Sequence, residues 1–324
     1  ALSSAASDVY KRQGYTTGSC AALAAKAACE MLLSRKFVGL VSIVTPGGLP
    51  VEADVVDACI GEGCAQCAVR KDAGDDADVT DGVLVYARVE HAGSGTGAAG
   101  SKGVPTRESE VSVDGGVGVG RVTLPGLEQP VGAAAINATP RAMITSAVRE
   151  VCAAHGFSGN IAVTISVPEG VSLAEKTFNP HLGIEGGISI LGTKGIVEPR
   201  SLAALRDSIE LEIRQHAAMG RRGVVLTPGN YGAQFISGHF HLNGAPVVFI
   251  SNFVGDAIDC CVREGFTNVL LVGHIGKLVK VAGGIMDTHS RTADCRAEIL
   301  AAHAALAGAG AVSYTHLRAH ETSA

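Results

Sequence analysis

Tryptophan is absent from the sequence, and aromatic residues make up only 4% of its 324 positions. The chain also lacks any uncharged apolar run of about 18 to 20 residues, the length that a membrane-spanning helix needs. Basic residues are slightly fewer than acidic ones, with 26 lysines and arginines against 31 aspartates and glutamates. The two kinds of charge are mixed along the chain. A membrane span and a nucleic-acid partner, which would favour a basic face, are therefore not expected. No basic, apolar leader precedes the first periodic segment, which favours a cytoplasmic protein.

The nine cysteines do not form a disulfide framework, since their number is odd and they are scattered along a long chain. Most are expected to be buried thiols. Cys64 and Cys67 form the sole CxxC pair, and no second pair or nearby histidine completes a zinc site. Metal or redox use of this pair stays an alternative, but no metal site is predicted in the protein.

Glycine, by contrast, is abundant at 42 residues, and hydrophobic residues make up 47% of the chain. This composition is typical of a globular protein with many tight turns. A chain of this length exceeds one ordinary core, so two domains are expected. Residues 1–11 and 312–324 do not continue the patterns that they flank and resemble translated sequencing adapters, so we expect them to be foreign.

Residues 12–180 alternate strand patterns with few helical ones and are expected to form an α+β domain. GYTTGSC at residues 14–20 leads into an alanine-rich stretch, where we expect a helix capped by Thr17 or Ser19. Residues 83–90 alternate apolar and polar side chains, which predicts a half-solvated strand. A second helix is expected to have Thr139 as its N-cap and to end at Gly156.

Residues 181–311 are expected to form an α/β doubly wound (Rossmann-like) domain. Four short apolar runs, GISILG, GVVLTPG, VVFISN and NVLLVG, each end at Gly, Pro or Asn and lead into a helical pattern. Continuous apolar strands that alternate with helices are typical of a parallel sheet covered on both faces. The ligand crevice of such a domain lies at the carboxyl ends of its strands.

Four loops follow these strands and are expected to line the crevice. Their glycines let a ligand approach the backbone, and the next helix offers unpaired N–H groups. No loop matches the dinucleotide or P-loop patterns, so those ligands are weakly supported. The loops are residues 192–195, 228–232, 251–256 and 273–277.

Lys277 and His274 are the side chains of the last loop that are suited to chemistry. Lys277 lies in the first turn of an expected helix, where the macrodipole disfavours a cation by roughly 0.3 to 1 kcal/mol. A bound anion would remove this conflict, and a solvated lysine is the alternative. His274 is suited to acid or base chemistry near neutral pH, with a hydrogen-bonded loop histidine as the alternative.

Asp72, Asp75, Asp76 and Asp78 form an acidic cluster. Their carboxylates suit a hard cation, but their spacing does not follow the EF-hand pattern. Asx turns, in which a short acidic side chain accepts a nearby backbone N–H, are the alternative. The sequence leaves both interpretations open.

Seven blocks of the sequence, in order, carry a resemblance to a known family. They are GYTTGSCAALAAKAA, KDAGDDADVTDG, VGVGRVTLPGLEQPVGAAAINATPRAMI, FNPHLGIEGGISILGTKGIVEPRS, TPGNYG, SNFVGDAID and GHIGKLVKVAGGIMDTHSRTAD. Together they resemble the CbiD-type cobalt-precorrin-5B carbon-1 methyltransferases of anaerobic cobalamin synthesis. That family has an arginine shortly before Gly-Tyr-Thr-Thr, and here the residue is Arg12, at the edge of the suspected foreign segment.

The resemblance implies transfer of a methyl group from S-adenosyl-L-methionine to carbon-1 of cobalt-precorrin-5B, giving cobalt-precorrin-6A. It also implies that cobalt arrives inside the tetrapyrrole substrate and that the partners are small molecules. A nicotinamide-dependent tetrapyrrole oxidoreductase stays open, because a strand-end crevice alone does not define its cofactor. A corrinoid-binding carrier is the other alternative. The sequence predicts no oligomeric state.

The site residues are physical hypotheses. His274, as a general base, and Lys277 are the expected catalytic residues, and both are expected, with Arg291, to face carboxylates of the tetrapyrrole. Asp256 is expected to bind a ribose hydroxyl. The expected cofactor-binding residues are Gly192, Thr193, Gly195, Gly229, Asn230, Tyr231, Gly232, Asn252 and Asp256. The residues expected to bind the substrate are Thr16, Thr17, Ser19, Lys71, Asp72, His289 and Arg291.

Overall fold

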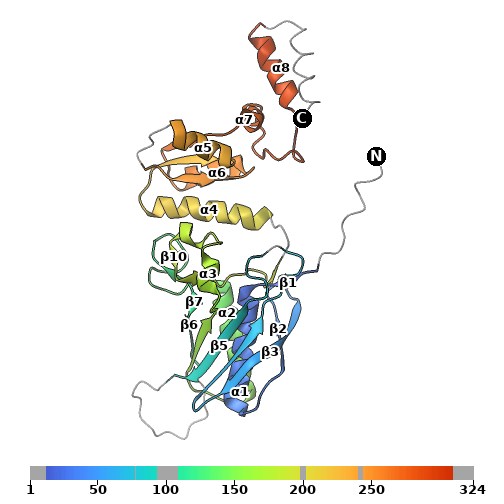
Figure 1. Cartoon of the computed structure of the whole chain (residues 1–324), viewed down its shortest axis with the longest axis vertical. Coiled ribbons are helices and arrows are strands. Elements are labelled where there is room, and N and C mark those ends of the chain that lie inside the picture. The colour runs from blue at the N-terminus through green and yellow to red at the C-terminus, as the bar shows by residue number, and fades with distance from the viewer. Residues whose placement is uncertain (1–11, 77, 93–108, 198–201, 240–243, 309–324) are drawn as a thin grey trace, which may run out of the picture. The chain divides into compact units, whose positions relative to one another are not determined.

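A computed structural model describes residues 12–76, 78–92, 109–197, 202–239 and 244–308 of the protein. Residue contacts divide the chain into two compact units, residues 1–201 and residues 202–324 (Figure 1). Both units combine helices with strands, so the protein is of the mixed α/β class. No described helix is both long and apolar enough to cross a membrane.

Unit 1 is built on a mixed sheet of six strands in the order β2-β3-β4-β5-β9-β6. Neighbouring strands are antiparallel, apart from β6 and β9, which are parallel. The expected alternation at residues 83–90 is confirmed, because Val85 and Val89 are buried whereas Arg88 is exposed. The strands are β2 (Leu40–Val44), β3 (Pro50–Ile60), β4 (Cys64–Arg70), β5 (Leu84–His91), β6 (Val111–Gly115) and β9 (Ile161–Ser166).

Two helices, α1 (Thr17–Ser34) and α2 (Ala138–Ala154), pack against each other, and α1 lies along the sheet against β4 and β5 (Figure 1). Nearly all of α1 is buried, because its alanines let neighbouring elements approach closely. Cys67 of the CxxC pair points into this core, where its Sγ donates to the carbonyl oxygen of Ala24 at 3.3 Å. Burial raises the pKa of the Cys67 thiol to about 12. This thiol therefore belongs to the apolar core of unit 1.

Helix α1 begins with a different cap from the one expected. Thr16, not Thr17 or Ser19, is the N-cap, and its Oγ1 accepts the N–H of Ser19 at 3.3 Å. Thr17 is already the first helical residue, and its hydroxyl donates to the carbonyl oxygen of Leu191 at 3.3 Å. Backbone angles decide which of several neighbouring hydroxyl residues is the cap, and the sequence alone does not fix them.

Helix α2 also begins before the residue expected from the sequence. Its N-cap is Asn137 rather than Thr139, and the N–H of Ala138 donates to the carboxylate of Glu128 at 3.2 Å. The expected C-terminal signal is confirmed, since Gly156 follows the helix with a φ of 62°.

Short strands place residues 184–197 in unit 1, and the predicted boundary after residue 180 therefore differs from the structural division after residue 201. GISILG is not a strand of a doubly wound sheet, because β11 pairs with β7 instead. The short elements are β1 (Gly14–Tyr15) with β12 (Ile196–Val197), β7 (Gly118–Val119) with β11 (Gly187–Ile188), β8 (Arg121–Val122) with β10 (Ile184–Glu185), α3 (Gly170–Ala174) and the 3₁₀ helix η1 (Asn179–Leu182).

Unit 2 has a parallel sheet of three strands in the order β14-β13-β15. The other three apolar runs predicted as parallel strands are confirmed in it. The chain runs from β13 to β14 on one side and then returns to β15 on the other, so the strand order reverses at β13. The elements are α4 (Leu202–Ala218), β13 (Gly223–Thr227), α5 (Asn230–His239), β14 (Val247–Phe249), α6 (Val254–Arg263), β15 (Asn268–Leu271), α7 (Ile275–Ala282) and α8 (Arg296–Leu306).

Glu212 on α4 is a buried carboxyl group, and none of the described residues donates a hydrogen bond to it. Burial raises the pKa of Glu212 from 4.5 to about 7. Because the folded state holds this proton more tightly than the unfolded state, stability falls as the pH rises from about 4.5 to 7. We expect Glu212→Gln to stabilise the protein at pH 8 by up to roughly 3 kcal/mol in urea unfolding. Equal free energies of unfolding for both proteins at pH 8 would contradict this prediction.

Candidate functional site

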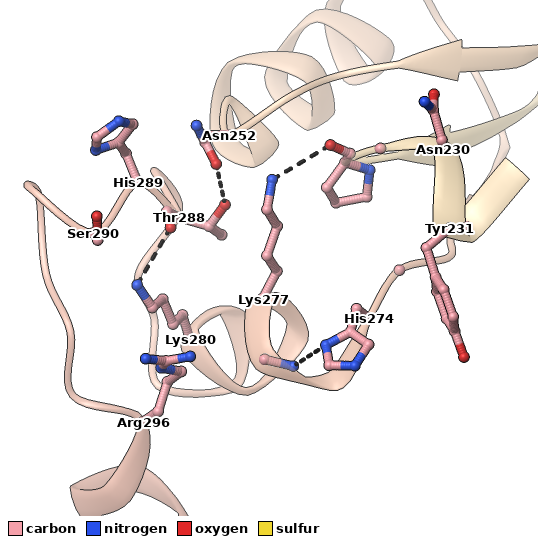
Figure 2. A pocket seen from close by; sticks show the side chains of 15 residues that line it. Asn230, Tyr231, Asn252, His274, Lys277, Lys280, Thr288, His289, Ser290 and Arg296 are labelled. Carbon is pink, nitrogen blue, oxygen red and sulfur yellow. Dashed lines mark hydrogen bonds between the residues drawn. The ribbon is translucent and has the colours of Figure 1, made fainter. Parts of the chain in front are cut away.

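A pocket of about 570 Å³ opens at the carboxyl ends of β13 and β15 (Figure 2). The strand order reverses between these two strands, and open parallel sheets bind ligands at such points. Its walls come from segments 228–232, 273–277 and 288–290, together with Asn252, Lys280 and Arg296. Three of the four loops expected to line the crevice therefore meet in one pocket.

Lys277 projects from the first turn of α7 into the middle of the pocket (Figure 2). Its Nζ lies 3.4 Å from the carbonyl oxygens of both Pro228 and Ser251. Among the residues that the structure describes, no carboxylate forms an ion pair with this ammonium. Burial, and then the charge of Lys280, lower the pKa of Lys277. The side chain is a partly desolvated cation, which a bound anion would stabilise.

His274 is the N-cap of α7, and its Nδ1 accepts the backbone N–H of Gly276 at 3.1 Å. The imidazole ring lies edge-on to the ring of Tyr231, with the ring centroids 5.4 Å apart. Since the cap uses the Nδ1 lone pair, Nε2 is the ring atom that remains for a ligand.

Sequence reasoning missed Lys280, which is only 4% exposed. Its Nζ donates to the carbonyl oxygens of Thr288 at 3.3 Å and Ala293 at 2.8 Å, and lies 3.7 Å from the carboxylate of Asp294. These contacts hold the loop between α7 and α8, part of which lines the pocket, against α7 (Figure 2). One signal was present in the sequence: Lys280 follows Lys277 by three residues, so both lie on one helix face.

Arg296, Thr288 and Ser290 are further lining residues that the sequence did not indicate. The guanidinium of Arg296 forms two hydrogen bonds with Asp294, of 2.8 and 3.2 Å. The hydroxyl of Thr288 donates to Oδ1 of Asn252 at 3.2 Å. Thr288 and Ser290 lie in the irregular loop between α7 and α8, and Arg296 is the first residue of α8, so no periodic pattern places them at the pocket.

The pocket brings together most of the site residues predicted in unit 2, but not all. Asp256 does not line it, because its carboxylate lies 3.2 Å from Nε of Arg206 on α4. That ion pair gives no support to the expected ribose contact. Arg291 does not line it either, and its backbone N–H donates to Nδ1 of His289 at 3.0 Å. The predicted residues that line the pocket are Gly229, Asn230, Tyr231, Gly232, Asn252, His274, Lys277 and His289.

Gly192, Thr193 and Gly195, expected to bind the cofactor, lie in unit 1 next to the start of α1. The carbonyl oxygen of Gly195 accepts the hydroxyl of Ser19 at 2.5 Å and the N–H of Thr16 at 3.2 Å. Gly192 has a φ of 136°, and a Cβ there would collide with the side chain of Thr16. Close packing explains Gly192, and the positive φ of 81° at Gly195, with Thr45 beside it, explains the second glycine. A ligand role for this corner stays a prediction.

Replacing Thr16 by valine is expected to destabilise unit 1 by about 1 kcal/mol, since the hydroxyl that caps α1 is lost. Thr16→Ser keeps this hydroxyl and is the matched control. Thermal unfolding followed by circular dichroism measures both variants. An unchanged melting temperature for Thr16→Val, together with weaker substrate binding, would instead favour the predicted ligand role.

The acidic cluster of unit 1 forms Asx turns and ion pairs. Asp78 accepts Nζ of Lys71 at 2.7 Å and the N–H of Thr80 at 2.8 Å. Although burial raises the pKa of Asp78, the hydrogen bonds from Lys71 and Thr80 outweigh it and lower this pKa overall. Asp72 accepts a backbone N–H two residues later at 2.8 Å, and its hydrogen bond with Arg12 lowers its pKa. The Asx-turn interpretation is confirmed for Asp72 and Asp78, and substrate binding by Lys71 and Asp72 stays a prediction.

The mixed α/β fold carries a polar pocket at the end of a parallel sheet, which is where open sheets of this kind bind small molecules. A sequence profile of the CbiD family matches residues 4–199, and the chain belongs to this family. The match confirms the resemblance that the sequence blocks indicated.

Two relatives of the chain carry the same name. The chain is 48% identical over 296 residues to the cobalt-precorrin-5B C(1)-methyltransferase of Ruminiclostridium cellulolyticum. The aligned residues make up 91% of this chain and 73% of that protein. The protein of the same name from a Thermoanaerobacter species is 48% identical, with coverages of 92% and 76%. A crystal structure described as a cobalamin biosynthesis protein (CbiD) of Archaeoglobus fulgidus is 26% identical with a TM-score of 0.44, covering 87% of this chain and 83% of that chain.

Proposed function

We propose that the protein methylates carbon-1 of cobalt-precorrin-5B and yields cobalt-precorrin-6A, with S-adenosyl-L-methionine as the methyl donor. The likeness to named relatives carries this proposal. At 48% identity the alignment spans 296 residues, more than the 201 residues of unit 1. The likeness to cobalt-precorrin-5B C(1)-methyltransferases therefore extends into unit 2, which we interpret as a small doubly wound unit that carries the pocket.

S-adenosyl-L-methionine supplies a methyl group on a sulfonium, which already contains a good leaving group. The part left to the protein is to bind the tetrapyrrole, to hold carbon-1 in line with that methyl group and to exclude water. A polar pocket at the edge of a parallel sheet suits the binding part of this task. Cobalt belongs to the substrate in this proposal.

The charge of the pocket does not suit the sulfonium group of the methyl donor. A sulfonium is a cation, and the pocket is lined by the cationic side chains of Lys277, Lys280 and Arg296. None of the described residues lining it is Asp or Glu, so ribose hydroxyls find no carboxylate partner among them. We therefore assign no step of the methyl transfer to these loops, and their cofactor contacts stay predictions.

Cofactor consumption separates this proposal from a nicotinamide-dependent oxidoreductase. The protein is incubated with its tetrapyrrole and with S-adenosyl-L-methionine or NADPH, and the cofactor products are quantified by liquid chromatography. We expect one S-adenosylhomocysteine for each macrocycle consumed and no oxidation of NADPH. Oxidation of NADPH, with S-adenosyl-L-methionine left unchanged, would contradict the proposal.

A further inference from the structure

Both histidines of the pocket are fixed in the same tautomer. Nδ1 of His274 accepts the N–H of Gly276 at 3.1 Å, and Nδ1 of His289 accepts the N–H of Arg291 at 3.0 Å. A backbone N–H can only donate, so each Nδ1 carries a lone pair, and the proton of the neutral ring lies on Nε2. Each ring therefore has an N–H donor, and no second lone pair, left for a ligand.

Other lining groups are also donors. Lys280 and Arg296 already contact Asp294, whereas the described partners of Lys277 are two carbonyl oxygens at 3.4 Å. Oδ1 of Asn252 accepts the hydroxyl of Thr288 at 3.2 Å, which leaves the amide NH₂ of Asn252 as a donor. Among the described residues that line this pocket, none carries a carboxylate. A ligand that matches it must supply acceptors and negative charge.

We propose that this pocket binds carboxylate groups of the tetrapyrrole, with Nζ of Lys277 and the Nε2–H groups of His274 and His289 as the donors. The inference rests on the proposed function, because that function supplies a substrate with peripheral carboxylates. His274 then acts as a hydrogen-bond donor and not as the general base expected from the sequence. The sulfonium of the methyl donor binds outside this pocket.

The lowered pKa of Lys277 agrees with this role. Burial and the neighbouring Lys280 both disfavour the charge of Lys277, and a carboxylate beside its Nζ reverses both effects. Phosphate, like carboxylate, is an anion that these donors can bind. The loops lack the glycine-rich patterns that cradle phosphates, which favours carboxylate as the ligand.

Two variants of His274 test the proposal because both preserve the fold of α7. Asparagine and aspartate have nearly the same shape and both cap helices well, so each can accept the N–H of Gly276 in place of Nδ1. Only aspartate adds a negative charge to the pocket wall. The probe is uroporphyrin, a metal-free octacarboxylate tetrapyrrole, whose fluorescence reports binding to the full chain. Calorimetry with S-adenosylhomocysteine and competition by inorganic phosphate are measured alongside.

We expect His274→Asn to weaken uroporphyrin binding by no more than about tenfold and His274→Asp to weaken it about 100-fold, since a like charge repels the carboxylates. The affinity for S-adenosylhomocysteine should stay unchanged in both variants, with equal melting temperatures. The proposal is overturned if the parent protein does not bind uroporphyrin, or if the two variants bind it equally. It is also overturned if millimolar phosphate displaces the probe, or if affinity for S-adenosylhomocysteine falls in parallel.

Turnover of the parent protein separates a failure of this inference from a failure of the proposed function. Methyl transfer without any difference between the two His274 variants rejects the carboxylate pocket alone. Charge-dependent binding of uroporphyrin without methyl transfer rejects the methyltransferase and leaves the carboxylate pocket standing.

Discussion

Lys277→Met is expected to lower kcat/KM for the tetrapyrrole about 100-fold, because the substrate carboxylate loses its main cationic partner. Most of the loss should appear as a higher KM, since binding of a peripheral group contributes equally to the ground state and the transition state. The melting temperature should not fall, because methionine removes a partly desolvated ammonium whose described partners are only two carbonyl oxygens. Steady-state kinetics over a range of tetrapyrrole concentrations measures the effect.

Two controls accompany this variant. Lys277→Arg keeps the positive charge and should retain most of the affinity for the tetrapyrrole. Lys26 is a lysine of unit 1 whose Nζ pairs with Glu150 at 2.8 Å, and Lys26→Met should leave the kinetics unchanged. A Lys277→Met protein with the kcat/KM of the parent would remove this residue from the binding site.

Lys71→Met is expected to destabilise unit 1 by about 3 kcal/mol, because it leaves the carboxylate of Asp78 without its cationic partner. Lys71 is only 2% exposed, and its Nζ lies 2.7 Å from Oδ2 of Asp78. The pKa of Asp78 is held below its ordinary value of 3.8 in the folded state. Its contribution to stability is therefore present above pH 3.8 and is lost as the pH falls through the lower, folded-state pKa.

Urea unfolding at neutral and acid pH measures this effect. The variant should lose more stability at pH 7 than in acid below the folded-state pKa of Asp78, since protonation there removes the charge that needs Lys71. Lys71→Met combined with Asp78→Asn should recover part of the loss, because the uncompensated charge is gone. If Lys71→Met keeps its stability and instead loses affinity for the tetrapyrrole, the predicted substrate role of Lys71 is supported and this account of the ion pair is wrong.

The sequence predicted those parts of the fold that depend on local periodicity. Alternation along residues 83–90 and the apolar runs that became β13, β14 and β15 are confirmed, since burial of one or both faces of a strand requires such patterns. The GISILG run was assigned to the wrong sheet because it has the same apolar pattern. Its place beside β7 depends on pairing with a segment about 70 residues earlier in the chain, which periodicity does not encode.

For the site, too, the sequence predicts features that depend on local pattern and misses those that depend on tertiary contacts. Strand ends located the pocket, because parallel strands end at one edge of their sheet. The contact of Arg206 with Asp256 and the contact of Lys280 with Asp294 join side chains from different elements or loops, and no local pattern indicates them. The tautomer of His274 depends on which backbone N–H reaches Nδ1, and that too is known only from the folded chain.

The most direct test of the account uses S-adenosyl-L-methionine labelled with carbon-13 in its methyl group. Cobalt-precorrin-5B is incubated with this donor and the protein, and the macrocycle is then analysed by mass spectrometry and carbon-13 NMR. The account predicts one labelled methyl group per macrocycle, bonded to carbon-1, and far less of this product with Lys277→Met. A macrocycle of unchanged mass that stays bound to the protein would contradict the account and identify a carrier.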